Sequence, residues 1–311
     1  MDPTRALLSQ VSRDRLDRWL RYLTLDPLHC RQVNYARPGQ DKSTLAEADA
    51  YIASELEAMG YTVAWEPHQA QAFRCDMSKP VAHRYSRPMP EDPWYTLHDL
   101  VIRRPAQDPN AELLIVVAHK DSQSWLQCAP AAYDNGTGTV ALMELANLLT
   151  QYENQRELMM IFCNEEHWPW TSVAKAQQIA ASGRAVAAVL NLDAVGVRSP
   201  EDVAAGRYTV VTRFSADAGR ELADLMAELV GRYDIGLAHG IRRAERPNDD
   251  DGSYIRAGIE KAILMMGMLP YPDPHYHTYE DAYEYVDLTG VCRSVKLALS
   301  FVLHVDRNGA P

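Results

Sequence analysis

Four runs of consecutive apolar residues stand out along the chain, at residues 112–121, 157–166, 187–196 and 261–268. A strand with one solvated face alternates apolar and polar residues, whereas a strand buried on both faces is apolar throughout. The four runs therefore predict buried strands. Between them, apolar residues recur at helical spacing over residues 138–150, 171–182 and 215–232. Strands that alternate with helices predict an α/β fold with a largely parallel sheet.

Helices are also predicted towards both ends of the chain. Apolar residues along one face predict a first helix from Pro3 to about Leu23 and a last helix over residues 288–305. Thr44 and Glu47 form a capping box in front of a further helix, which Gly60 closes.

The region after that helix changes character. Residues 61–67 predict a strand, and residues 68–95, rich in proline and charge, predict a loop-rich excursion. The chain of 311 residues shows no repeat and no low-complexity tract, and it is long enough for a sizeable core. We expect a single domain over residues 1–311, a three-layer sandwich with a central mixed, mostly parallel sheet flanked by helices.

Composition and charge exclude some partners. The formal net charge is −11 and no Lys/Arg run marks a basic stripe, so we expect no nucleic-acid partner. No window looks apolar and long enough to cross a bilayer, and the charged N-terminus does not match a signal peptide. The five cysteines are scattered without a CxxC pair, which is typical of a reduced protein. We therefore expect a cytoplasmic protein with no membrane partner.

Candidate metal ligands follow three of the four apolar runs. His119 and Asp121 end the first run, Glu165 and Glu166 end the second, and Asp193 ends the third. An ionised carboxylate at the end of a dry strand is costly unless it is paired or binds a metal. Because ligands bind at the carboxyl ends of the strands in such sheets, three strand ends of this kind predict one shared site.

Two further segments offer ligands. In AYDNGTGTVALMELANLL, residues 132–149, a tight Asp-Asn-Gly turn is followed by helical rather than alternating spacing, so the turn delivers Asp134 to the start of a helix. An Asp in that place is ordinarily an N-cap, so the turn alone does not identify a ligand. In PHYHTYED, His275 and His277 are both candidates, and spacing does not choose between them.

Five motifs taken together resemble a known family. In chain order they are VVAHKDS, YDNGTGTVALMELANLL, MMIFCNEEHWPWTSVAKA, AAVLNLDAVG and YHTYEDAYEYVD. They are similar to the successive motifs of the co-catalytic zinc aminopeptidases, the family of bacterial leucyl aminopeptidase and aminopeptidase Y. The resemblance covers roughly residues 43–305. It implies a zinc exopeptidase-like fold and a site that holds two zinc ions per chain.

The resemblance assigns the metal ligands residue by residue. His119 and Asp193 would hold one zinc ion, Glu166 and His277 would hold the other, and Asp134 would bridge both. His277 is favoured over His275 because its YHT context resembles the family ligand. Two imidazoles and three carboxylates suit zinc.

The resemblance also assigns two residues that act beside the metals. Glu165 would be the general base, and Asp121 would orient the ring of His119, since metal-bound histidines ordinarily need such a partner. Two zinc ions about 3.5–4 Å apart polarise a carbonyl and lower the pKa of a bridging water.

Neighbouring residues have several interpretations. His167 is expected to pack in the pocket wall rather than to bind metal. Trp168 and Trp170 either line the substrate pocket or belong to the core, and Trp168 is kept as a candidate substrate-binding residue. Trp125 and Cys128 are expected to shape the site, and Cys128 is not expected to act as a nucleophile.

One stretch departs from the family pattern. Many relatives carry Ser-Asp-His before an aromatic residue, but in DDDGSYIRAGIEKAILMMG the position of that His is taken by Asp251. If Asp250 is the Asp of the motif, Arg246 stands where some relatives have a Tyr that stabilises the oxyanion. Arg246 either lies in a solvated loop or binds an oxyanion or a substrate carboxylate. Tyr254 in the same stretch is a further candidate substrate-binding residue.

Three functions remain open at this stage. The resemblance favours a metal-dependent hydrolase that releases an N-terminal residue from a peptide or cleaves a small amide. Glutaminyl cyclases share the scaffold and give a second hypothesis, an acyltransferase, although DNGTG and NLDAVG match the hydrolase forms. A non-catalytic binding module on a peptidase fold is the third, and retention of all five ligands and Glu165 argues against it. The sequence leaves the substrate and the oligomeric state open.

Overall fold

The protein is described by a computed structural model that covers residues 2–80, 83–268 and 274–311. Within these residues a nine-stranded sheet forms the centre, in the order β10-β9-β11-β8-β5-β6-β4-β1-β7, and β2 pairs separately with β3. The strands are β1 (Ala64–Ala72), β2 (Arg74–Cys75), β3 (Tyr85–Ser86), β4 (Trp94–Arg104), β5 (Leu113–His119), β6 (Glu157–Cys163), β7 (His167–Trp168), β8 (Val186–Leu192), β9 (Thr209–Phe214), β10 (Ala238–Arg243) and β11 (Ala262–Met266).

The centre of the sheet is parallel and its flanks are not. The four adjacent strands β11, β8, β5 and β6 run in one direction. On one side β4, β1 and β7 continue the sheet by antiparallel pairing, and on the other β9 is antiparallel to β11. Because β5, β6 and β8 are parallel neighbours, their carboxyl ends meet at one edge of the sheet. This edge carries the candidate ligands.

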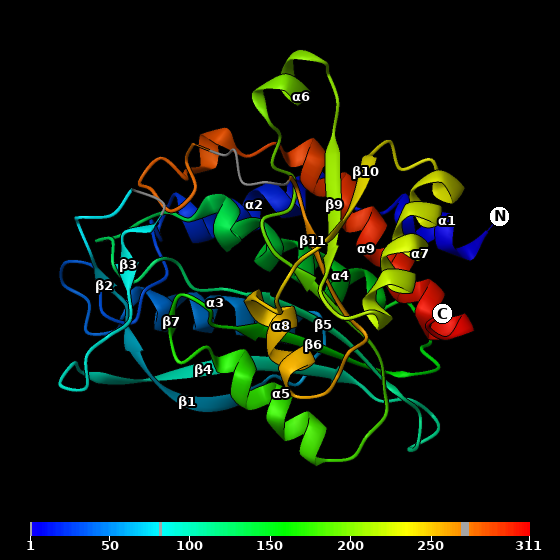
Figure 1. The fold of residues 1–311 in the computed structure, drawn as a ribbon, viewed down its shortest axis with the longest axis horizontal. Coiled ribbons are helices and arrows are strands. Elements are labelled where there is room, and N and C mark those ends of the chain that lie inside the picture. Colours follow the sequence, from blue (N-terminus) through cyan, green and yellow to red (C-terminus); the bar gives the residue numbers. More distant parts are fainter. Residues whose placement is uncertain (1, 81–82, 269–273) are drawn as a thin grey trace.

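Helices cover both faces of the sheet (Figure 1). They are α1 (Pro3–Leu8), α2 (Arg13–Thr24), α3 (Thr44–Ala58), α4 (Gly138–Leu149), α5 (Thr171–Ala181), α6 (Pro200–Ala204), α7 (Ala218–Tyr233), α8 (Asp249–Arg256) and α9 (Leu288–Asn308). The larger core lies under α2, α3, α4, α7 and α9, which pack on one face. The smaller core lies on the other face, under α5 and α8. This arrangement confirms the predicted α/β sandwich with a central mixed sheet.

The strongest patterns in the sequence became the expected elements. The four apolar runs are β5, β6, β8 and β11, and the segments with helical spacing between them are α4, α5 and α7. Strands β4, β9 and β10 and helix α8 were not predicted. In β4 the buried apolar residues are interrupted by Asp99, which is fully buried. Its carboxylate accepts a hydrogen bond from the Thr171 hydroxyl at 2.5 Å, so the polar residue is tolerated inside the sheet.

Two predictions about the N-terminal helices were wrong in detail. The expected helix over residues 3–23 is two helices, because Ser12 caps the start of α2 and its backbone N–H donates to Glu144 on α4. The capping box was misplaced by one residue. Ser43, not Thr44, accepts the bond from the backbone of α3, and the carboxylate of Glu47 pairs with Arg37 instead of returning to the cap.

The excursion is shorter than residues 68–95 because its ends belong to the sheet. Strand β1 continues to Ala72 and pairs with β4, with Gln71 opposite Trp94. Between these strands, Arg74 pairs with Ser86 and Cys75 with Tyr85 in the small β2–β3 ladder. The excursion therefore starts and ends in paired strands of the sheet and contains a small ladder of its own. It lies at the left of the molecule in Figure 1.

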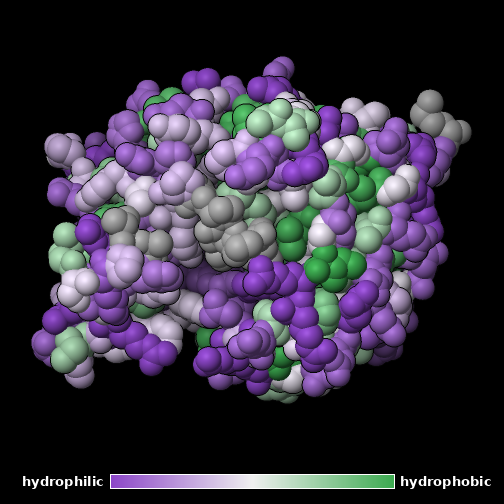
Figure 2. Space-filling model, turned by 45° about the horizontal axis from the view of Figure 1, so that its top comes forward, coloured by the Kyte–Doolittle hydropathy of each residue, from purple (hydrophilic) through white to green (hydrophobic). Residues whose placement is uncertain are grey.

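Two observations concern the expected absence of a membrane partner: the hydrophilic surface and one long apolar helix. Hydrophilic residues cover most of the face seen in Figure 2, and the hydrophobic ones gather in small groups. Contrary to the expectation from sequence, one described helix, α9, is long and apolar enough to cross a bilayer. Of its most apolar window 72% is buried inside the fold, so α9 serves as the central core helix here.

Candidate metal centre

The parallel strands gather the predicted ligands at one edge of the sheet. His119 is the last residue of β5, Glu165 and Glu166 follow β6, and Asp193 follows β8. The register places His119 opposite Cys163 in β6, and Val117 opposite Asn191 in β8. Residues at the same height on adjacent strands lie close together, so three separate runs of sequence converge on one point.

The turn that carries Asp134 is fixed to the end of β8. The Asn135 side chain donates to the Leu192 carbonyl at 2.8 Å and accepts from the backbone N–H groups of Gly138 and Ala194 at 2.9 and 3.1 Å. A Cβ on Gly138 would lie 2.2 Å from both the Asn135 amide oxygen and the Leu192 carbonyl oxygen. The Asp-Asn-Gly-Thr-Gly motif therefore serves close packing of backbone against backbone, with Asp134 held beside Asp193.

A buried carboxylate that the sequence analysis did not single out secures the same turn from the other side. The backbone N–H groups of Tyr133 and Asp134 donate to the Asp281 carboxylate at 2.7 and 3.1 Å. Asp281 lies four residues after His277, so it ties the loop that carries His277 to the turn that carries Asp134. The signal was present, because Asp281 belongs to the quoted motif YHTYEDAYEYVD.

The two carboxylate oxygens of Asp134 face two different histidines. Its Oδ1 lies 3.1 Å from Nε2 of His119, and its Oδ2 lies 2.9 Å from Nε2 of His277. Asp193 Oδ1 approaches the first imidazole at 3.5 Å, and Glu166 Oε1 approaches the second at 3.2 Å. The five side chains thus form two half-sites that share Asp134, which is the arrangement that a dinuclear metal centre needs.

Two groups of side chains offer ligand atoms that lie within 4.8 Å of one another. One group is Asp134, Glu166 and His277, and the other is His119, Asp193 and Glu165. Glu165 is therefore close enough to touch a metal in the first half-site. Its role as base rather than ligand stays a prediction.

Buried atoms that make no hydrogen bond, although carboxylates lie near them, fit a metal at this place. His277 is 5% exposed, yet within the described residues neither of its ring nitrogens makes a hydrogen bond. Asp193 Oδ1 and Glu165 Oε2 are also buried and without a hydrogen-bond partner there. Polar atoms left in this state cost free energy unless something satisfies them. Nitrogen and oxygen donors that converge in this way suit zinc.

Asp121 organises the backbone around the cluster. Its Oδ1 lies 3.2 Å from Nδ1 of His119, and its Oδ2 lies 2.7 Å from Nδ1 of His167. The backbone N–H groups of Glu165 and Glu166 donate to the same carboxylate at 3.0 and 2.9 Å. One fully buried anion therefore orients a predicted ligand and positions both glutamates, as expected for the partner of a metal-bound histidine.

The environment of Glu165 suits a proton acceptor. Burial, followed by the charges of Asp250 and Asp249, raises the pKa of Glu165 well above its ordinary value. A carboxylate with a raised pKa holds a transferred proton better than an ordinary one. Asp249 comes from the first turn of α8 and has a left-handed backbone (φ 58°). It lines the cavity that opens over the cluster. The sequence analysis did not name Asp249 as a site residue.

The rival histidines are separated by the fold. His275 stacks on Tyr285 with ring centroids 4.1 Å apart, and its Nδ1 lies 3.3 Å from Glu280. His277 instead points into the cluster from a left-handed backbone conformation (φ 55°), which is uncommon for a residue with a side chain. His167 is fully buried against Asp121 and does not face the cavity, in line with a packing role.

The cavity over the cluster has two apolar sides. Phe73, Tyr85, Trp125 and Trp170 line it on one side. A smaller recess that reaches Asp134 is lined by Tyr133, Ala194, Val197, Met266, Met268 and Tyr276. Four of these residues form a small buried cluster of their own: Tyr133, Ala194, Val197 and Met268.

Arg246 and Tyr254, two of the candidate substrate-binding residues, do not line this cavity. Arg246 is exposed between β10 and α8, and Tyr254 is fully buried in the core beneath α8. Trp168 is half-buried and contacts Phe73, at a centroid distance of 6.4 Å, and Arg87, so it supports the cavity wall from behind. Sequence could not place these side chains because α8 was not recognised as a helix.

The loop between β5 and the Asp134 turn rests on the N-terminal segment. Arg31 is fully buried and its guanidinium donates to the carbonyls of Lys120, Pro130 and Ala131 at 2.6–2.8 Å. The Sγ atom of Cys128 in this loop contacts that of Cys30, at 2.6 Å. An isolated Arg in a sequence gives no sign of such a role, and the analysis missed it.

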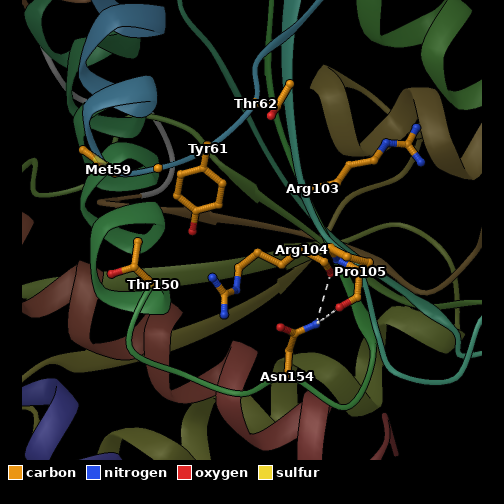
Figure 3. Close-up of a pocket in the computed structure, with 9 residues that line it drawn as sticks. Met59, Tyr61, Thr62, Arg103, Arg104, Pro105, Thr150 and Asn154 are labelled. Atoms are coloured by element: carbon orange, nitrogen blue, oxygen red, sulfur yellow. Dashed lines mark hydrogen bonds between the residues drawn. The ribbon is translucent and has the colours of Figure 1, made fainter.

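A second cavity lies away from the cluster and is shown in Figure 3. It opens where the end of α3 meets the end of β4, and Tyr61, Arg104 and Asn154 are among its lining residues. None of the predicted site residues lines it. The five predicted metal ligands line the other cavity, at the carboxyl ends of the central strands.

Similar structures share this fold. A Legionella pneumophila LapA aminopeptidase structure superposes with a TM-score of 0.74 at 21% identity, covering 97% of this chain and 74% of that chain. A Porphyromonas gingivalis glutaminyl cyclase superposes with a TM-score of 0.71 at 13% identity, covering 94% and 98%. At these identities the likeness establishes the fold alone.

Similar sequences point to aminopeptidases. Leucine aminopeptidase 1 of Fusarium vanettenii is 26% identical over 223 residues, which are 66% of this chain and 54% of that protein. A probable aminopeptidase of Saccharomyces cerevisiae is 23% identical over 220 residues, 67% of this chain and 57% of that protein. The chain thus spans little more than half the length of these relatives.

The family itself is established by a match over most of the chain. The model of peptidase family M28 matches residues 99–302, a range that includes every predicted ligand from His119 to His277. The chain belongs to peptidase family M28.

Proposed function

We propose that this protein is an aminopeptidase-type hydrolase that cleaves an amide bond with two zinc ions and Glu165 as general base. The observation that carries the proposal is the bridging position of Asp134, whose two oxygens lie 3.1 and 2.9 Å from the imidazoles of His119 and His277. A site for one ion would not need this carboxylate to face both halves. Membership of family M28 and the sequence relatives support peptide substrates.

The residues of the chain divide the work. His119 and Asp193 would hold one ion and Glu166 and His277 the other, with Asp134 between them. Bound zinc ions supply Lewis-acid polarisation of the scissile carbonyl and a lowered pKa for the attacking water. Glu165 would take a proton from the attacking water and deliver it to the leaving amine.

The variant Glu165→Gln tests the proposal. It keeps the size of the side chain but cannot accept a proton, so we expect hydrolysis to fall about 10²–10⁴-fold while zinc content stays near two ions per chain. The measurements are turnover of leucine amide and zinc content on the same preparations. Near-normal turnover at matched zinc content would place the base elsewhere. Loss of one zinc ion would mean that Glu165 is a ligand.

Glutaminyl cyclases share this fold, so a cyclase is the second function to be tested. A peptide with N-terminal glutamine separates the two functions. A cyclase releases ammonia and leaves the rest of the peptide intact, whereas an aminopeptidase releases free glutamine. Absence of both products from zinc-loaded protein, with hydrolysis of other peptides also absent, would favour a binding module.

A further inference from the structure

The aromatic side of the cavity is formed by rings in mutual contact. The ring centroids of Tyr85 and Trp125 lie 4.9 Å apart, and those of Phe73 and Tyr85 lie 5.7 Å apart. Both Tyr85 and Trp125 also meet the imidazole of His277 in edge-on geometry, at 5.7 and 4.9 Å. Phe73, Tyr85 and Trp125, here called the aromatic wall, therefore continue directly from a predicted metal ligand.

The aromatic wall comes largely from outside the part of the chain that the family model matches. Phe73 and Tyr85 belong to the excursion, before residue 99, and only Trp125 lies within the matched range. Two consecutive hydrogen bonds through Ser124 hold the excursion at the site. The backbone N–H of Phe73 donates to the Ser124 hydroxyl at 2.8 Å, and this hydroxyl donates to the carbonyl of Glu166 at 2.6 Å.

The two sides of the cavity differ in their exposure. In the recess, Tyr133, Ala194, Val197 and Met268 are each at most 9% exposed. Tyr85 in the aromatic wall is 38% exposed, so the wall reaches the open mouth of the cavity. Under the proposed function the terminal residue is held at the cluster, so the remainder of the peptide has to leave towards solvent, on the side where Tyr85 is exposed.

We propose that the aromatic wall is a subsite for the residue that follows the scissile bond, and that it selects substrates with an aromatic side chain there. Aromatic pairs contribute about 0.5–1.5 kcal/mol beyond the area they bury, which is up to roughly a tenfold difference in affinity. The exposed ring of Tyr85 offers such a contact, and its neighbours Phe73 and Trp125 hold it in place. The inference rests on the proposed aminopeptidase function and names its substrate class.

The test compares leucyl-phenylalanine with leucyl-alanine, which differ only at the residue that follows the scissile bond. We expect the wild-type protein with zinc to have a kcat/KM about tenfold higher for leucyl-phenylalanine. In Tyr85→Ala this ratio should fall to near one, and Tyr85→Phe, which keeps the ring, should preserve it. Trp94→Ala removes another exposed aromatic residue, at the start of β4, and should leave the ratio unchanged.

Leucine amide, which has no residue after the scissile bond, separates this proposal from the one on which it rests. If wild-type protein hydrolyses leucine amide but shows equal kcat/KM for the two dipeptides, the aromatic subsite is overturned and the proposed function stands. The same conclusion follows if Tyr85→Ala keeps the wild-type ratio. If none of the three compounds is hydrolysed, the proposed function fails and the subsite fails with it.

Discussion

Replacement of Asp121 by Asn would test how the cluster is held together. Asp121 receives four contacts through two oxygens, from the rings of His119 and His167 and from the backbone N–H groups of Glu165 and Glu166. An Asn side chain has the same shape but only one acceptor oxygen. Its NH₂ group would then face two of the present donors.

The expected losses of stability and of zinc affinity follow from those contacts. Hydrogen bonds to a charged partner contribute about 1.5–3 kcal/mol each, so the loss of two implies a reduction in the free energy of unfolding of roughly 3 kcal/mol or more. Either the ring of His119 and the backbone of Glu165, or the ring of His167 and the backbone of Glu166, would lose the oxygen that fixes their position. Loss of such a supporting group typically lowers metal affinity by about 10–100-fold, and we expect zinc affinity to fall by this factor in Asp121→Asn.

Zinc affinity is measured by competition with a chelator, and the free energy of unfolding is measured with a denaturant. Asp306→Asn is a matched control, because Asp306 is a fully buried carboxylate that accepts from the backbone N–H groups of Gln155 and Arg156 and from the Tyr152 hydroxyl. It lies on α9, whose side chains do not line the cavity. The control should lose stability and keep its zinc affinity. Zinc affinity within about twofold of wild type in Asp121→Asn would refute the reasoning.

Three further outcomes follow from the geometry. Asp134→Ala should reduce zinc content from two ions to fewer than one per chain, because both half-sites lose a ligand, whereas His277→Ala should remove one ion; elemental analysis decides. Gly138→Ala should lower the melting temperature and the zinc content together, since its Cβ would meet two oxygens at 2.2 Å. Burial lowers the pKa of His239 to about 4, so the unfolded chain binds more protons below about pH 6.5. Stability should therefore fall as pH drops from about 6.5 to 4, and His239→Gln should flatten that slope in unfolding experiments.

The sequence alone determined the parts of the molecule that follow from local pattern. The continuous apolar runs became β5, β6, β8 and β11, because a strand covered on both faces has to be apolar along its length. The polar residues directly after three of these runs had to meet, since neighbouring parallel strands end at the same edge. The fold class was predicted in this way and the family from the resemblance of five motifs, and both are confirmed.

Local pattern failed where polar residues are satisfied by distant partners. Strand β4 was not recognised because Asp99 lies buried within it. Arg31 and Asp281 were overlooked although both hold the segment that leads to Asp134. A buried charge next to its partners in space looks like any other polar residue in the chain. Only the folded arrangement shows which groups it pairs with.

The tertiary structure also decided among alternatives that spacing left open. It turned His277 into the cluster and stacked His275 on Tyr285, and it left Arg246 on the surface. It placed the ring of Tyr85, from an excursion that carries no motif, against the imidazole of His277. Loop side chains point where contacts with other parts of the chain hold them, and those contacts join residues that the sequence separates by up to some two hundred positions, which no local period can encode.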